Sequence, residues 1–214
     1  ELRKILEHRT QELIEYQNLS YAKEYMSFVG NIFEKEQKTR SSSELSQNVA
    51  KYLFKLMATK DEYEVARLSL KAELDSAINK EFGKSAKISY MLHPPFLKAM
   101  ENIPILNMLP GVKSKLALGS WFKVFYVMLK NMKFLRGTPF DFMAWFSNDV
   151  RKADRKALDH YKSILSKNID EIGNGKYQDL KDFSILPDII RGYEEVRLET
   201  MDEYYSKSNN LFKS

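Results

Sequence analysis

Apolar residues recur every three or four positions along most of the chain, which is the spacing of one face of an amphipathic helix. The first run predicts one long helix over residues 1–38, with a hinge or a new helix start near Asn18 and Ser20. A second run follows the polar loop TRSSS at 39–43, where a serine can cap the next helix. The apolar positions of the two runs are Leu2, Ile5, Leu6, Leu13, Tyr16, Tyr25, Val29 and Ile32, then Leu45, Val49, Leu53, Leu56 and Met57.

A third helix is predicted from Asp61 to Gly83. Asp61 is a suitable N-cap, and Glu64 lies at the position that completes a capping box. Gly83 suits the end of the helix, because glycine adopts the left-handed backbone conformation that often follows the last turn. The predicted buried face consists of Tyr63, Ala66, Leu70, Leu74, Ala77 and Ile78.

The pattern changes after Gly83. Residues 86–93, AKISYMLH, alternate over a short distance and predict a strand that Pro94 and Pro95 stop, although no neighbouring segment suggests a partner strand. Residues 101–120 contain prolines and glycines and predict an irregular connection.

Helical spacing returns in the C-terminal half. Helices are predicted near 120–134, 140–168 and 188–212, and residues 173–185 are interpreted as the connection between the last two. The chain is therefore expected to be mainly α, an irregular bundle of about six or seven helices, with one or two short strands near 86–93. Its expected organisation is the long helix at 1–38 followed by a helical domain over 44–214.

Composition agrees with a packed protein. Of the 214 residues, 43% are hydrophobic and 13% aromatic, which is enough to build a core. The net charge of +5 comes from 34 basic and 29 acidic residues, a mixture typical of solvated helix faces and not of nucleic-acid binding. Without cysteine the chain offers no disulfide, thiolate zinc site or cysteine-ligated cluster, which agrees with a cytoplasmic location. No run of 18 apolar residues predicts a membrane span, so membrane association is not favoured.

Few residues suggest catalysis. His8, His93 and His160 do not have the spacing that places two imidazoles on one helix face, so each is expected to be structural. Neither a glycine-rich phosphate loop nor a GxSxG nucleophile motif occurs. Carboxylates are frequent, but their helical spacing favours solvated or lysine-paired side chains.

A stretch without acidic residues extends from Asn102 to Phe140 and includes the predicted helix at 120–134. We favour a core helix with a lysine edge for that segment. The alternatives are a docking face for an acidic partner and a helix that lies on an anionic membrane surface. The basic residues of the stretch are Lys113, Lys115, Lys123, Lys130, Lys133 and Arg136.

The segment LRGTPFD at 135–141 predicts a tight turn into a helix. Gly137 frees the backbone and Thr138 can cap the helix that follows. Asp141 lies near the positive end of that helix, and Arg136 is predicted to pair with it. The alternative is that Arg136 and the free amides of the turn bind a phosphate or carboxylate.

Three blocks carry a resemblance to a known family. LFKLMATKDEYEVARL at 53–68, KFLRGTPFDFM at 133–143 and LPDIIRGYEEV at 186–196 resemble, in order and spacing, the C-terminal region of fused indolepyruvate ferredoxin oxidoreductases. YMLHPPFL at 90–97 is a weaker match, and residues 11–29 resemble the end of the acceptor-type domain that precedes this region. The resemblance therefore implies that the helix at 1–38 is the tail of a preceding domain.

The resemblance implies a parent enzyme that depends on thiamine diphosphate and Mg²⁺, decarboxylates aryl pyruvates, passes electrons through iron–sulfur clusters to ferredoxin and releases an acyl-CoA. This chain has no thiamine motif, no cluster cysteine and no recognisable CoA motif, so no cofactor and no catalytic residue is assigned to it. The implied partners are the remainder of the parent chain, a second copy of the parent in a homodimer, and ferredoxin.

The role expected for this piece is structural, with caps and ion pairs that hold the helix junctions. The rival role is an anion-binding module that contacts CoA or the 2-oxoacid, and the third is a membrane-surface or partner-docking domain. The structural role would use Asp61, Glu62, Glu64, Arg67 and Asp141, and the anion-binding role would use Arg136, Thr138, Arg191 and His93.

Overall fold

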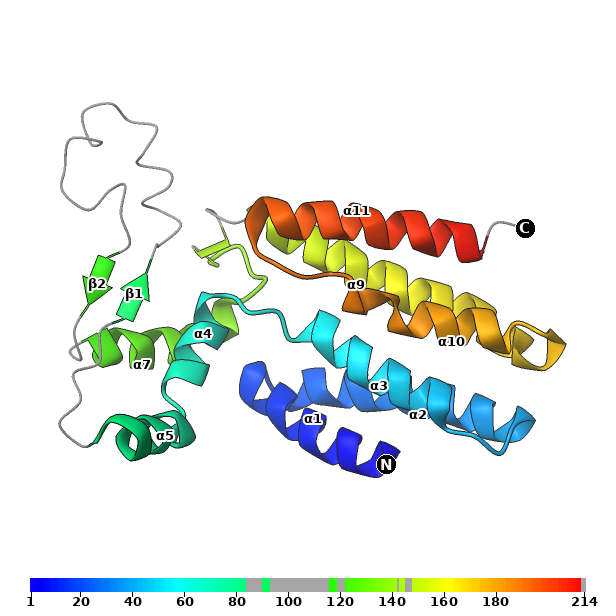
Figure 1. The fold of residues 1–214 in the computed structure, drawn as a ribbon, viewed down its shortest axis with the longest axis horizontal. Helices are drawn as coiled ribbons and strands as arrows, with labels where there is room; N and C mark the ends of the chain where they lie inside the picture. The colour runs from blue at the N-terminus through cyan, green and yellow to red at the C-terminus, as the bar shows by residue number, and fades with distance from the viewer. Residues whose placement is uncertain (84–89, 93–115, 119–121, 142, 145–147, 213–214) are drawn as a thin grey trace. The chain divides into compact units, whose positions relative to one another are not determined.

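The computed structural model describes residues 1–83, 90–92, 116–118, 122–141, 143–144 and 148–212. They belong to two compact units, unit 1 with residues 1–59 and 149–214, and unit 2 with residues 60–148 (Figure 1). The predicted mainly α class is confirmed, and the nine α-helices in the described ranges exceed the six or seven expected. The domain boundary expected between residues 38 and 44 falls inside unit 1, because the helices on its two sides pack together.

Unit 1 is built from helices and the short segments that connect them in its described residues. Two 3-10 segments, η4 (Ile169–Asn174) and η5 (Leu186–Asp188), lie between its last three helices. Its helices are α1 (Leu2–Tyr16), α2 (Leu19–Thr39), α3 (Glu44–Met57), α9 (Asn148–Asn168), α10 (Tyr177–Ile185) and α11 (Glu194–Leu211).

The run predicted as one helix over 1–38 forms two. Gln17 and Asn18 interrupt the predicted helix. The backbone of Asn18 is extended, and its side-chain oxygen accepts a hydrogen bond from the amide of Tyr21 at 2.9 Å. A new helix start at Asn18 is therefore present, as the sequence predicted. α1 and α2 lie side by side as an antiparallel pair (Figure 1).

The core of unit 1 joins both halves of the chain. Val49 and Leu53 of α3 are buried as predicted, together with Tyr161 of α9 and Phe183 of α10. The hydroxyl of Tyr161 donates to the backbone oxygen of Ser184 at 2.8 Å, so this buried phenol is satisfied. The interpretation of residues 177–185 as a connection was wrong, because α10 buries Leu180 and Phe183 in this core.

Unit 2 contains four α-helical or 3-10 elements and one small sheet in its described residues. The helix predicted from Asp61 to Gly83 is two helices, because Lys71 adopts an extended backbone conformation between them. Leu74 and Ala77, expected on the buried face, are exposed. The elements are α4 (Glu62–Ser69), α5 (Ala72–Phe82), β1 (Tyr90–Leu92), β2 (Leu116–Leu118), α7 (Lys123–Asn131) and η3 (Met132–Leu135).

The strand predicted near 86–93 has a partner that the neighbouring sequence did not indicate. β1 pairs antiparallel with β2, with Met91 opposite Ala117, so the partner strand lies far along the chain from the segment whose alternation predicted a strand. Residues 86–89, Pro94, Pro95 and most of the segment at 101–120 fall outside the described residues. α4 packs on α7, where Tyr63 and Ala66 form a small core with Tyr126 and Leu129.

Candidate functional site

The carboxylate of Asp61 is the centre of a buried polar network in unit 2. Asp61 precedes α4, and its Oδ1 accepts the amide of Glu64 at 2.9 Å, the N-cap that the sequence predicted. Arg136 donates two hydrogen bonds to the same carboxylate, from Nε to Oδ2 at 2.5 Å and from Nη2 to Oδ1 at 2.8 Å. The two side chains are 7% and 13% exposed, so this bidentate pair is largely shielded from solvent.

A second ion pair lies within α4. Arg67 donates to Glu64 through Nε–Oε2 and Nη2–Oε1, both at 2.8 Å, and both residues are buried. The carboxylate of Glu64 therefore binds Arg67, and the contact of Glu64 with Asp61 is made by its amide. Glu62 adds negative charge to the first turn of α4, where the helix dipole favours it.

Asp141 fixes the turn that follows η3. Its carboxylate accepts the hydroxyl of Tyr63 at 2.9 Å and the amide of Gly137 at 3.0 Å, and its side chain is buried. Arg136 pairs with the carboxylate of Asp61, a partner that the sequence did not indicate. The physical reason is tertiary: α4 brings Asp61 and Tyr63 to the turn, which no local pattern indicates. The pairing of Arg136 with Asp141 stays a prediction.

The structure describes three of the four residues considered for anion binding. Arg136 is engaged by Asp61, and the hydroxyl of Thr138 donates to the backbone oxygen of Leu135 at 2.7 Å. His93 lies outside the described residues. Arg191 belongs to unit 1, whereas Arg136 and Thr138 belong to unit 2.

Arg191 lies in an exposed turn before α11. Its side chain is 69% exposed and donates to Asp188 through Nη2–Oδ2 at 2.7 Å and Nε to the backbone oxygen at 2.9 Å. Gly192 and Glu194 have φ values of +80° and +50°, and the second is unusual for a residue with a side chain. A conformation of this kind at Glu194 persists only where the surroundings hold it.

Lys55 of α3 reaches the same turn and donates to the backbone oxygen of Asp188 at 3.0 Å. Burial lowers the pKa of Lys55, and the nearby charges of Arg191 and Arg197 act in the same direction while Asp188 opposes them. Burial acts to raise the pKa of Asp188, but Arg191 and Lys55 outweigh it and the pKa is lowered. This corner of unit 1 therefore contains several cations close together.

The sequence analysis did not single out Glu36, a buried carboxylate of unit 1 that accepts several hydrogen bonds. Glu36 is fully buried near the end of α2, and its oxygens accept the amides of Leu45 at 3.0 Å and Ser46 at 2.9 Å. It also accepts the hydroxyl of Ser46 and, at 2.9 Å, that of Tyr177. The cap of α3 is thus supplied from another helix. The available signal was a glutamate in the last turn of a helix, where the dipole disfavours it.

A second missed pair joins α9 to α11. Arg197 donates from Nε to Oδ1 of Asp154 at 2.7 Å, and the side chains are 17% and 12% exposed. Burial raises the pKa of Asp154 against the opposing effect of Arg197. The pair therefore fixes the two helices, with desolvation as its cost.

The basic helix predicted at 120–134 has one face in the core of unit 2. Phe122, Tyr126 and Leu129 of this segment are buried, and Lys123 pairs with Asp75 of α5 at 2.8 Å. Val124 is 76% exposed. The core interpretation thus holds for the buried face, and docking or membrane-surface roles stay predictions for the opposite face.

The described part of the chain contains neither a metal-binding cluster nor a membrane-spanning helix. There, no group of three or more His, Asp and Glu side chains is arranged to hold a metal ion. Within the same ranges, every helix is too short or too polar to cross a bilayer.

The fold and the polar networks define a mainly α protein whose distinctive charged residues cap helices and pair with one another. Residues 2–209 match the model of a family of unknown function, DUF6537, and the chain belongs to that family. No curated protein and no solved structure matches the chain.

Proposed function

We propose that this chain is a non-catalytic structural module of a thiamine-diphosphate-dependent 2-oxoacid:ferredoxin oxidoreductase of the indolepyruvate type. The single observation that supports the role is that polar residues of the blocks 53–68 and 133–143 bind one another. Asp61 binds Arg136, Glu64 binds Arg67, and Asp141 binds Tyr63. Side chains committed to one another in a buried network hold helix junctions, whereas catalytic groups must reach a substrate.

The chemistry of such an enzyme would come from other parts of the parent polypeptide. Thiamine diphosphate supplies carbanion stabilisation, and cysteine-bound clusters supply electron transfer to ferredoxin. This chain has no cysteine to bind a cluster. Its proposed contribution is to pack on the remainder of a cytoplasmic, homodimeric enzyme.

The test is made on the complete parent polypeptide. We expect the purified protein to contain thiamine diphosphate and iron, and to reduce ferredoxin when supplied with an aryl pyruvate and CoA. A complete protein that contains neither thiamine diphosphate nor iron overturns the parent-enzyme proposal.

Variants of the same protein test the structural role separately. Arg136→Met should lower the melting temperature but leave kcat per folded, cofactor-loaded enzyme unchanged. Lys207→Met, which removes an exposed pair with Glu203 in α11, is the matched control and should change neither quantity. A loss of kcat in Arg136→Met at unchanged stability would contradict a purely structural role.

A second candidate function is anion binding at Arg191. The specific observation is that Arg191 is 69% exposed while Asp188 orients it, and that Nζ of Lys55 lies 3.5 Å from Oδ1 of the same carboxylate. A phosphate of CoA or the carboxylate of a 2-oxoacid has the charge and geometry that an oriented guanidinium recognises.

Calorimetric titration separates this candidate from the structural proposal. CoA and aryl pyruvates are titrated into the chain and into Arg191→Met, with Lys207→Met as the control. Heat that disappears only in Arg191→Met supports the site, and the absence of heat at millimolar ligand removes the candidate.

A further inference from the structure

The α1–α2 pair of unit 1 has an apolar groove on its surface. The groove has a volume of about 720 Å³, and its lining includes Leu2 and Leu6 of α1 and Met26, Val29 and Phe33 of α2. Met26 is 46% exposed and Phe33 is 37% exposed, so large apolar side chains face solvent there.

Gly30 lies in the interior of α2 and lines the groove. A Cβ placed on this residue would meet nothing within 4 Å, so none of the described residues requires glycine here. Glycine in a helix interior is destabilising relative to alanine. Its presence leaves bare backbone in the groove, where another surface can approach closely.

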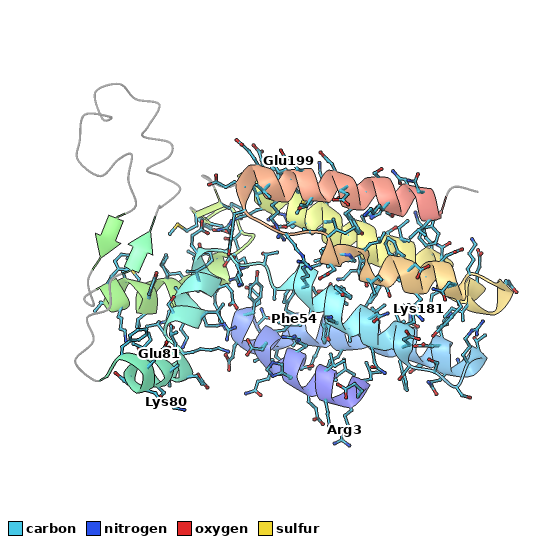
Figure 2. The ribbon with its side chains drawn as sticks, in the orientation of Figure 1. Arg3, Phe54, Lys80, Glu81, Lys181 and Glu199 are labelled. Atoms are coloured by element: carbon cyan, nitrogen blue, oxygen red, sulfur yellow. The ribbon has the colours of Figure 1, made fainter. Side chains whose placement is uncertain are left out.

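Charged residues border the groove on α1. Arg3 donates from Nε to Oε1 of Glu7 at 2.7 Å, and the two side chains are 91% and 62% exposed. Figure 2 shows Arg3 pointing away from the helices of unit 1. Such a pair adds little to the stability of its own helix and leaves both charges accessible to a partner.

The two helices place these features at one level. α1 ends at Tyr16 and α2 begins at Leu19, so an antiparallel pair sets Ile5 about level with Gly30. Arg3 and Glu7 then lie about 3 Å before and after that level along α1, given the helical rise per residue. On α2, Met26 and Phe33 likewise flank Gly30 on its two sides.

This arrangement is complementary to itself. A two-fold axis across the helices at the level of Gly30 would bring Arg3 of one copy to Glu7 of the other, and Glu7 to Arg3. The same rotation would bring Met26 of one copy towards Phe33 of the other. A two-fold interface requires one patch to match itself in this way.

We propose that the groove is the surface through which two copies of this chain associate, with the two α1–α2 pairs packed across a two-fold axis at Gly30. The resulting four helices would bury Met26 and Phe33 around the close backbone approach at Gly30. This inference does not rest on the proposed oxidoreductase function, because unit 1 alone supplies its evidence.

Sedimentation velocity of the 214-residue chain over a series of concentrations tests association. We expect a concentration-dependent dimer for the unchanged chain. Gly30→Trp and Met26→Lys should be monomeric at the same concentrations, with helix content verified by circular dichroism. A chain that is monomeric at every concentration up to millimolar overturns the proposal, whatever other apolar molecule or protein the groove binds.

Charge reversal tests the register. Arg3→Glu alone places a second carboxylate against Glu7 of the other copy, and Glu7→Arg alone places two arginines together, so each should weaken dimerisation about tenfold. An equal mixture of the two variants should regain the affinity of the unchanged chain, because only the mixed dimer pairs opposite charges across the axis.

The matched controls are Glu203→Lys and Lys207→Glu, which break an exposed pair of the same spacing in α11. They should leave dimerisation unchanged. Arg3→Glu and Glu7→Arg variants that dimerise as well as the controls, or a mixture that stays as weak as its components, would show that the two-fold register is wrong.

Discussion

Arg136 binds the carboxylate of Asp61, 75 residues earlier in the chain, and the same carboxylate accepts the first-turn amide of Glu64. One buried carboxylate therefore caps α4 and fixes the segment that follows η3. The arginine neutralises the charge of a capping carboxylate that is largely shielded from solvent.

Arg136→Met should destabilise unit 2 by about 3 kcal/mol, because it leaves Asp61 buried without its cation. Urea unfolding followed by far-ultraviolet circular dichroism measures the change in the free energy of unfolding. The double variant Asp61→Asn with Arg136→Met should recover part of the loss. Additive effects of the two single changes would contradict a direct interaction.

Glu36→Gln should destabilise unit 1 by about 1–2 kcal/mol, because a neutral amide replaces the carboxylate that accepts two amides of the α3 N-terminus. Urea unfolding followed by far-ultraviolet circular dichroism measures the change. Glu34→Gln, at an exposed position in the same helix, is the control and should have no effect. Equal effects of the two substitutions would remove the capping role.

Gly30→Ala should stabilise unit 1 by about 0.5–1 kcal/mol, because the new Cβ enters open space in a helix interior. The measurement is made in a Met26→Lys background, which is expected to be monomeric, so that association does not contribute. Gly192→Ala should act in the opposite direction, because φ is +80° there and the Cβ would lie 2.7 Å from Cγ1 of Val196. A destabilising Gly30→Ala would mean that the helix needs glycine for its own packing.

His160 should make unit 1 less stable at mildly acidic pH. Burial lowers the pKa of His160, Lys167 acts in the same direction, and Nδ1 lies 3.0 Å from the hydroxyl of Tyr204. The unfolded chain then binds a proton at a higher pH than the folded chain. Stability should fall as pH drops through the ordinary histidine pKa, about 6.5, towards the lowered value.

His160→Gln should remove most of this dependence between neutral pH and about pH 5, the window below the ordinary histidine pKa. Thermal unfolding at a series of pH values measures it. His8→Gln is the matched control, because His8 is exposed. An unchanged slope in His160→Gln would assign the effect to other groups.

Features encoded within a few residues could be predicted from the sequence. The buried face of α3, with Val49 and Leu53, follows from helical spacing, and the Asp61 cap follows from residue type and the three-residue distance to Glu64. The Asn18 helix start is equally local. In each case neighbouring residues supply the interaction.

Features that depend on distant residues could not be predicted. Asp61 and Arg136 meet because α4 packs against the segment around η3, and Glu36 reaches Tyr177 across 141 positions. α10 was not predicted, because nine residues are too few to show a clear helical periodicity. Its contact with α3, which is distant in the sequence, stabilises it. The break at Lys71 interrupts a pattern that looks continuous in the sequence.

Unit 1 is assembled from two separated stretches, with residues 60–148 between them. On a ribosome, α1–α3 emerge long before α9–α11, so the apolar side of α3 has no permanent cover while unit 2 is being synthesised. Completing unit 1 also requires closing a long loop, which slows folding relative to a bundle of sequential helices. The nascent chain is therefore expected to depend on chaperones until α11 has emerged.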